Sequence, residues 1–110
     1  MNKQIKRGDV YWATFDDPIG RHPAVVVQND IGNKYAPNVI VVLVTSVPAD
    51  KAYPTDVLLP DELLPMRNSR VLTSTVLTVE KVALDQFIVS LPQKVMIKID
   101  SALKVSLGLE

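Results

Sequence analysis

The amino-acid sequence predicts a mainly β fold: a compact, strongly twisted antiparallel sheet or small barrel, closed by one C-terminal α-helix. Three observations predict it. Short aliphatic and β-branched runs recur between residues 10 and 90. Proline and glycine interrupt the chain between these runs. Only the segment after Pro92 repeats its apolar residues at helical spacing. Short β-rich runs between turn residues are typical of antiparallel sheets and barrels.

The first half of the chain predicts three strands. Side chains alternate along residues 10–15, which is the period of a strand with two distinct faces. A loop follows at 16–22. Residues 24–27 and 39–44 are continuous aliphatic runs rich in β-branched residues. Because both runs are short and bounded by turn residues, we expect buried central strands rather than helices. Residues 29–33 form a polar connection between them.

The second half continues the pattern with shorter signals. Residues 55–59, 69–73 and 87–90 are rich in strand-forming side chains, and each predicts a further strand. The segment 78–81 lies between the last two and predicts a single helical turn.

The C-terminal segment has a different periodicity. Lysine and serine side chains occupy one face after Pro92, and apolar residues recur at three- and four-residue steps on the other. This spacing is typical of an amphipathic helix. Pro92 suits its first turn and Gly108 suits its end. The apolar positions are Val95, Met96, Ile99, Ala102, Leu103 and Leu107.

Length and composition limit the possible classes of protein. The 110 residues, 47% of them hydrophobic, are enough for one folded domain spanning 1–110. The chain has no cysteine, which excludes disulfides and thiolate metal sites. Charged residues near the N-terminus occupy positions where a signal peptide needs apolar ones, so we expect a cytoplasmic protein. Twelve basic and twelve acidic residues argue against binding nucleic acid by general charge attraction alone.

Four segments, in this order, resemble the MazF/PemK family of toxin ribonucleases. Each segment alone is a weak signal, but together they cover nearly the whole chain at compatible spacing. They are residues 6–12 (KRGDVYW), 22–30 (HPAVVVQND), 38–46 (NVIVVLVTS), and 69–84 followed by 99–103 and 107–109.

The resemblance implies properties that composition and periodicity do not. It implies an SH3-like barrel, a homodimer, and neutralisation by a small MazE-like antitoxin whose disordered tail folds on binding. It also implies the toxin of a type II toxin–antitoxin system, which cleaves single-stranded RNA selectively without a metal ion or other cofactor. The reaction implied leaves a cyclic 2′,3′-phosphate.

Such a reaction needs few groups from the protein. The ribose 2′-hydroxyl attacks the adjacent phosphorus, so the enzyme must accept its proton, stabilise the phosphoryl charge and protonate the leaving 5′ oxygen. The resemblance assigns these roles to an arginine before the proline of the second strand and to the threonine that ends the third strand. Thr45 occupies the second position.

The first of these positions departs from the family. His22, not arginine, precedes Pro23, and Arg21 lies one residue earlier. Two assignments are open. His22 can act as acid or base, because imidazole exchanges protons near neutral pH. Alternatively, Arg21 supplies the phosphate-binding cation after a one-residue shift of the loop. A third interpretation makes His22 an ordinary surface residue.

Further departures concern contacts with RNA. The loop before Arg21 is shorter than the usual family loop, and Thr75 and Leu77 stand where the family often has glutamine and arginine. The hydroxyl and loop residues that remain are candidates for RNA contacts, because unpaired bases stack on aromatic side chains and accept hydrogen bonds. These candidates are Ser46, Tyr53, Pro54, Ser74 and Thr75.

The missing arginine leaves an alternative function open. A non-cleaving member of the same fold could act as a DNA gyrase poison, or as a protein that binds RNA or the antitoxin without cutting. No residue spacing in the chain indicates a metal site.

Overall fold

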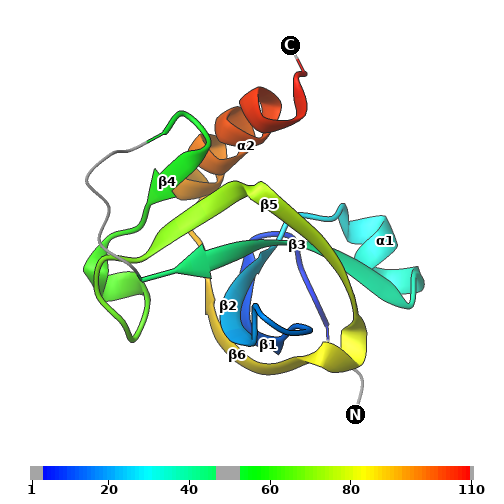
Figure 1. Cartoon of the computed structure of the whole chain (residues 1–110). Coiled ribbons are helices and arrows are strands. Elements are labelled where there is room, and N and C mark those ends of the chain that lie inside the picture. The colour runs from blue at the N-terminus through cyan, green and yellow to red at the C-terminus, as the bar shows by residue number, and fades with distance from the viewer. Residues whose placement is uncertain (1–3, 47–52, 110) are drawn as a thin grey trace.

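The computed structural model describes residues 4–46 and 53–109. Six strands form one sheet, the long helix α2 packs against one of its faces, and the short helix α1 joins two of the strands (Figure 1). The strands are β1 (Asp9–Thr14), β2 (Arg21–Val26), β3 (Asn38–Thr45), β4 (Asp56–Leu58), β5 (Arg70–Glu80) and β6 (Leu84–Ser90), and the helices are α1 (Asp30–Tyr35) and α2 (Gln93–Leu107), with short 3₁₀ helices η1 (Asp61–Leu63) and η2 (Lys81–Ala83).

The sheet has the order β4-β5-β3-β2-β1-β6, and every neighbouring pair is antiparallel. It curls strongly, so that β5 and β6 arch around β1 and β2 (Figure 1). Among the described residues, no pairing joins the edge strands β4 and β6. The predicted mainly β class with a C-terminal helix is confirmed. The expected SH3-like barrel is, in its hydrogen bonding, an open and curled sheet.

The continuous aliphatic run of β3 is buried on both faces of the sheet. Successive side chains of a strand point to opposite faces. Val42 and Val44 accordingly join Val25 in the core beneath α2, while Val41 and Leu43 join the second core, inside the curl. Burial on both sides explains why this strand does not alternate between apolar and polar residues.

The second half of the sheet differs from the sequence prediction. The strand predicted at 69–73 continues as β5 to Glu80, so the helical turn predicted at 78–81 is wrong for its first three residues. Of the four residues in that predicted turn, only Lys81 lies in a helix, at the start of η2. The ladder from Asn38↔Glu80 to Thr45↔Arg70 holds β5 against β3. Pairing between residues far apart in sequence therefore overrides the weak local signal.

The predicted polar connection at 29–33 contains the start of a helix. The Asn29 side chain caps α1 by accepting a hydrogen bond of 2.8 Å from the Gly32 backbone N–H. The predicted C-terminal helix is confirmed as α2, with Pro92 as the residue before it and Gly108 ending it in a left-handed conformation at φ 70°. Within the described chain, no helix is long and apolar enough to span a membrane.

The Arg7-Gly8-Asp9 segment forms hydrogen bonds with the residue after β2, with α2 and with β6. The Arg7 guanidinium donates to the Val27 carbonyl at 2.8 Å and to Asp100 of α2 at 2.7 Å. The buried Asp9 carboxylate accepts from the Ser90 hydroxyl at 2.7 Å. Charge-assisted hydrogen bonds of this length are strong. The segment therefore has a structural role in this chain.

Candidate functional site

The candidate catalytic residues lie where β2 begins and β3 ends. His22 is the second residue of β2 and Thr45 is the last residue of β3, and both are half-buried. The recorded β2–β3 pairs run from Val26↔Val41 to Ala24↔Leu43. Pro23 has no N–H to extend this ladder.

The register nevertheless places His22 beside Thr45. Continuing it by two residues beyond Ala24↔Leu43 brings His22 directly opposite Thr45. Opposite residues of an antiparallel pair project from the same face, with Cβ atoms about 4.5–5.5 Å apart. The continued register therefore puts the two candidate side chains on the same face of the sheet.

Arg21 projects from the other face of β2, because successive side chains alternate. Its guanidinium carbon lies 4.5 Å from the centre of the Trp12 ring on β1. The same group donates to the Asp85 carboxylate on β6 at 3.1 Å. Arg21 thus reaches across β1, away from β3 and Thr45. In this arrangement the Arg21 guanidinium contacts Trp12 and Asp85.

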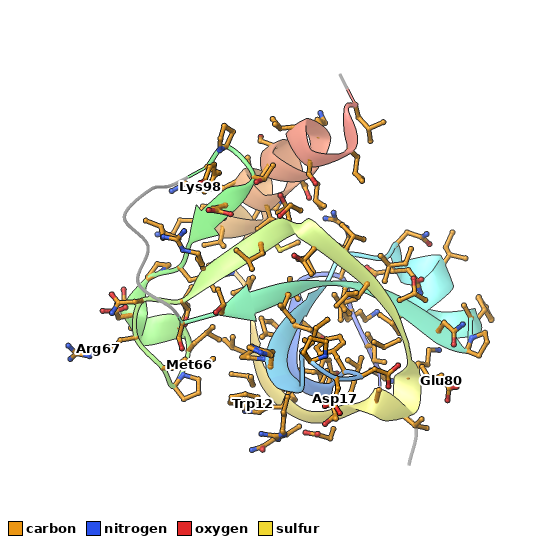
Figure 2. All side chains as sticks on the ribbon, in the orientation of Figure 1. Trp12, Asp17, Met66, Arg67, Glu80 and Lys98 are labelled. Carbon is orange, nitrogen blue, oxygen red and sulfur yellow. The ribbon has the colours of Figure 1, made fainter. Side chains whose placement is uncertain are left out.

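A pocket of about 340 Å³ lies beside these strand ends. Arg21 and His22 line it together with Ser46, one of the predicted RNA contacts, whereas Thr45 is not among its lining residues. Figure 2 shows Trp12 and Met66 on the same side of the molecule, and both line this pocket. Sequence reasoning missed both. In the sequence, a single tryptophan in an alternating strand and a methionine in a loop look the same whether they line a pocket or pack in the core.

A larger pocket, of about 480 Å³, lies between the β1–β2 loop and the far end of β5. Its wall includes Leu77, which stands where the family often has arginine, and the carboxylates of Asp16, Asp17 and Glu80. Figure 2 labels Asp17 and Glu80 near this end. Three carboxylates repel a phosphate, so the pocket that contains Arg21 and His22 suits an anionic substrate better.

Ser74 and Thr75 lie in an irregular part of β5. The β3–β5 register passes from Val42↔Val76 to Leu43↔Leu72, which leaves residues 73–75 without partners on β3. The buried Thr73 hydroxyl in this bulge donates to the Thr55 carbonyl at 2.6 Å. Ser74 is exposed and Thr75 is half-buried. Bulges of this kind redirect side chains beside functional sites.

Tyr53 and Pro54 lie toward α2, away from the pocket of His22. Pro54 lines a separate depression with Leu58 of β4 and Ile97 of α2. The backbone N–H of Tyr53 donates to Asp56 at 3.3 Å. The structure therefore does not bring these two residues together with His22 and Thr45.

Arg70 is a charged neighbour of Thr45 that sequence reasoning did not single out. Thr45 and Arg70 are directly opposite on β3 and β5. The Arg70 guanidinium donates to Asp56 at 3.1 Å, with exposed side-chain fractions of only 9% and 6%. A buried cation thus lies one strand away from the candidate catalytic threonine. Among the described residues, no cluster of histidine and carboxylate side chains could hold a metal ion.

Comparison with known proteins covers almost the whole chain. Residues 6–107 match the family described as PemK-like, MazF-like toxin of type II toxin–antitoxin system. The chain is 35% identical over 111 residues to Endoribonuclease EndoA of Bacillus subtilis (strain 168), covering 96% of each protein. It is 37% identical over 112 residues to Endoribonuclease MazF of Staphylococcus epidermidis, covering 96% of this chain and 92% of the relative.

Solved structures are similar over the same extent. An endoribonuclease in complex with its cognate antitoxin, from a mycobacterial species, superposes with a TM-score of 0.83 at 27% identity, covering 96% of this chain and 97% of that one. MazE-MazF (Form-II) from Deinococcus radiodurans gives a TM-score of 0.80 at 24% identity, covering 99% and 100% of the two chains. At that identity the second likeness concerns the fold alone.

Proposed function

The chain belongs to the PemK-like, MazF-like family of toxins of type II toxin–antitoxin systems, and on this premise we propose that it is an endoribonuclease that cleaves single-stranded RNA in the cytoplasm without a metal ion. The observation that carries the proposal is the register of β2 and β3, which, when continued to the strand ends, puts His22 opposite Thr45. The names of the two curated relatives support the same activity.

The proposed reaction uses the RNA itself as nucleophile. The 2′-hydroxyl loses its proton and forms a bond to the adjacent phosphorus, the bond from phosphorus to the 5′ oxygen breaks, and that oxygen takes up a proton. The products are a 2′,3′-cyclic phosphate and a 5′-hydroxyl. Because the attacking oxygen is already tethered to the phosphate, correct positioning supplies much of the acceleration.

His22 and Thr45 have different roles in this reaction. The His22 imidazole transfers a proton to or from the reacting oxygens, which guanidinium cannot do at neutral pH. The Thr45 hydroxyl donates a hydrogen bond to a phosphoryl oxygen as negative charge grows on it. Arg21 acts at the rim of the site, because its stacking on Trp12 and its ion pair with Asp85 direct it away from Thr45.

We also propose that the toxin forms a homodimer and is neutralised by a MazE-like antitoxin with a disordered tail. Exposed apolar side chains on β4 and α2 favour a second copy as the partner of that face. Leu58, Ile97 and Val105 are each more than half exposed there. Exposed apolar surface of this kind is typical of an interaction site. The structural relative solved with its antitoxin supports the second partner.

Cleavage of RNA by the purified protein in EDTA tests the proposed activity. The substrate is a mixture of single-stranded RNAs, because the recognised sequence is not fixed by the residues of the site. We expect fragments with cyclic phosphate at the 3′ end. The matched variant is Thr45→Val, which keeps the shape of the side chain and removes its hydroxyl.

Intact RNA at protein concentrations where dimers form would favour the second candidate, a non-cleaving protein of the same fold. This candidate is supported by His22 and Leu77, which stand at two positions where the family has, or often has, arginine. The chain therefore lacks two positive charges at those positions. Growth arrest with broken DNA and intact RNA would identify a gyrase poison. RNA binding without cleavage would identify a binding protein.

A further inference from the structure

The pocket beside His22 has walls suited to a flat ligand. Its volume is about 340 Å³, and its apolar wall comes from β1, β2, β3 and the loop before β5. Trp12 contributes to it from β1, and Pro65 and Met66 contribute from the loop before β5. The polar groups on the wall are those of Arg21, His22 and Ser46.

Trp12 and Arg21 form a stacked pair at one wall. The guanidinium carbon of Arg21 lies 4.5 Å from the centre of the indole ring, a distance typical of a cation–π contact. The Asp85 carboxylate, 3.1 Å from the guanidinium, accepts a hydrogen bond from it. The Arg21 side chain remains 48% exposed, so its outer surface is available to a ligand.

We propose that this pocket binds one unpaired base of the RNA substrate between the Trp12–Arg21 pair and the Met66 side chain. The inference rests on the proposed function, because it assigns a subsite for the same substrate. His22 and Ser46 line the pocket, so a base held there lies against the ends of β2 and β3, beside one of the two candidate catalytic residues.

The chemistry of the walls favours a base over an apolar side chain of a protein partner. Bases of every kind have a flat π-face that stacks on tryptophan and on guanidinium planes. Met66 is a flexible thioether that adapts to aromatic rings. Arg67, the next residue, projects into solvent beside Met66 and offers a positive charge to the RNA backbone (Figure 2). An apolar side chain would use neither cation.

Intrinsic fluorescence provides a direct test, because Trp12 is the only tryptophan of the chain. The probe is a short single-stranded oligonucleotide pool with 2′-deoxyribose, which lacks the attacking hydroxyl and cannot be cleaved. A pool of equal length without bases is the matched probe. We expect the normal pool to change the Trp12 emission saturably, and the abasic pool to bind at least about tenfold more weakly, as expected for the loss of stacking.

A pair of variants locates the effect. Met66→Ala should weaken binding of the normal pool about two- to tenfold, as expected for the loss of a sulfur–aromatic contact, whereas Ile31→Ala, on the exposed surface of α1, should leave it unchanged. Equal affinity for the two pools, or saturating binding measured by anisotropy with no change in Trp12 emission, would overturn the proposal. A response only to an antitoxin-derived peptide would also overturn it.

The two proposals fail in distinguishable ways. Cleavage of RNA in EDTA together with equal affinity for the normal and abasic pools would refute the base pocket and leave the nuclease intact. A base-dependent change in Trp12 emission without cleavage of any RNA would refute the nuclease and leave the pocket intact.

Discussion

Arg70 of β5 and Asp56 of β4 form an ion pair of 3.1 Å in which both side chains are more than nine-tenths buried. Arg70 is also directly opposite Thr45 of β3. The pair therefore joins the short edge strand β4 to the part of the sheet that ends at the candidate catalytic threonine. Its geometry gives the first prediction.

Removing one member of this pair should destabilise the protein more than removing both. Asp56→Leu leaves an uncompensated buried guanidinium and should lower the free energy of unfolding by about 3–5 kcal/mol. Arg70→Leu should have a similar effect, because it leaves the buried Asp56 carboxylate without its cation. The double variant should recover much of this loss. Denaturant unfolding of the four proteins measures the coupling, and additive losses would contradict it.

His22 and Arg21 should differ sharply in their effect on RNA cleavage. His22→Ala should lower the cleavage rate about 100-fold or more, which is the usual contribution of a positioned acid or base. Arg21→Ala should act mainly on substrate binding, because its side chain is directed toward Trp12 and Asp85. Single-turnover rates at saturating protein separate the two effects. A loss of the chemical step in Arg21→Ala alone would assign the cation role to Arg21.

The Asp30 carboxylate should make stability depend on pH in the acid range. The backbone N–H of Arg7, which donates to it at 2.7 Å, and then the Asn33 side chain lower the pKa of Asp30 below its usual value. A lowered pKa in the folded state stabilises the fold above the unfolded pKa, and this contribution is lost as the pH falls through the folded pKa.

Asp30→Asn should therefore lower the free energy of unfolding near pH 7 by about 1 kcal/mol, a small value because the carboxylate is exposed. The difference from the parent protein should shrink as the pH falls below about 4, the ordinary range of an aspartate. Thermal unfolding of both proteins from pH 7 to pH 3 measures it. A difference that stays constant over this range would show that the charge of Asp30 does not contribute.

Gly8 should tolerate a side chain less well than Gly20. Both have positive φ angles, 96° and 73°, so an alanine at either position adopts an unfavourable backbone conformation costing about 1–2 kcal/mol. An added Cβ at Gly8 would lie 3.4 Å from the Met96 side chain, which is an ordinary van der Waals contact, so the backbone decides the difference. The φ of Gly20 lies close to the left-handed region that other residues can adopt, whereas the φ of Gly8 lies farther outside it. Gly8→Ala should thus destabilise the protein more than the matched control Gly20→Ala. Equal losses would mean that the backbone at Gly8 relaxes toward the left-handed region without cost.

Local signals in the sequence were enough to predict β3 and α2. The aliphatic run of β3 and the helical spacing of α2 predicted both elements within a few residues of their ends. These signals depend only on neighbouring residues, through the burial of a strand on two faces or of a helix on one. The position of Thr45 at the end of β3 followed from the same run.

The tertiary structure decided what depends on register between distant strands. The continuation of β5 to Glu80 follows from its ladder with β3. The separation of Arg21 and His22 onto opposite faces follows from where β2 begins to pair with β1. Trp12 of β1 and Met66 of the loop before β5 line one pocket although they are far apart in the sequence. Local sequence signals do not specify these features, because strand faces and long-range contacts are set by pairing across the whole sheet.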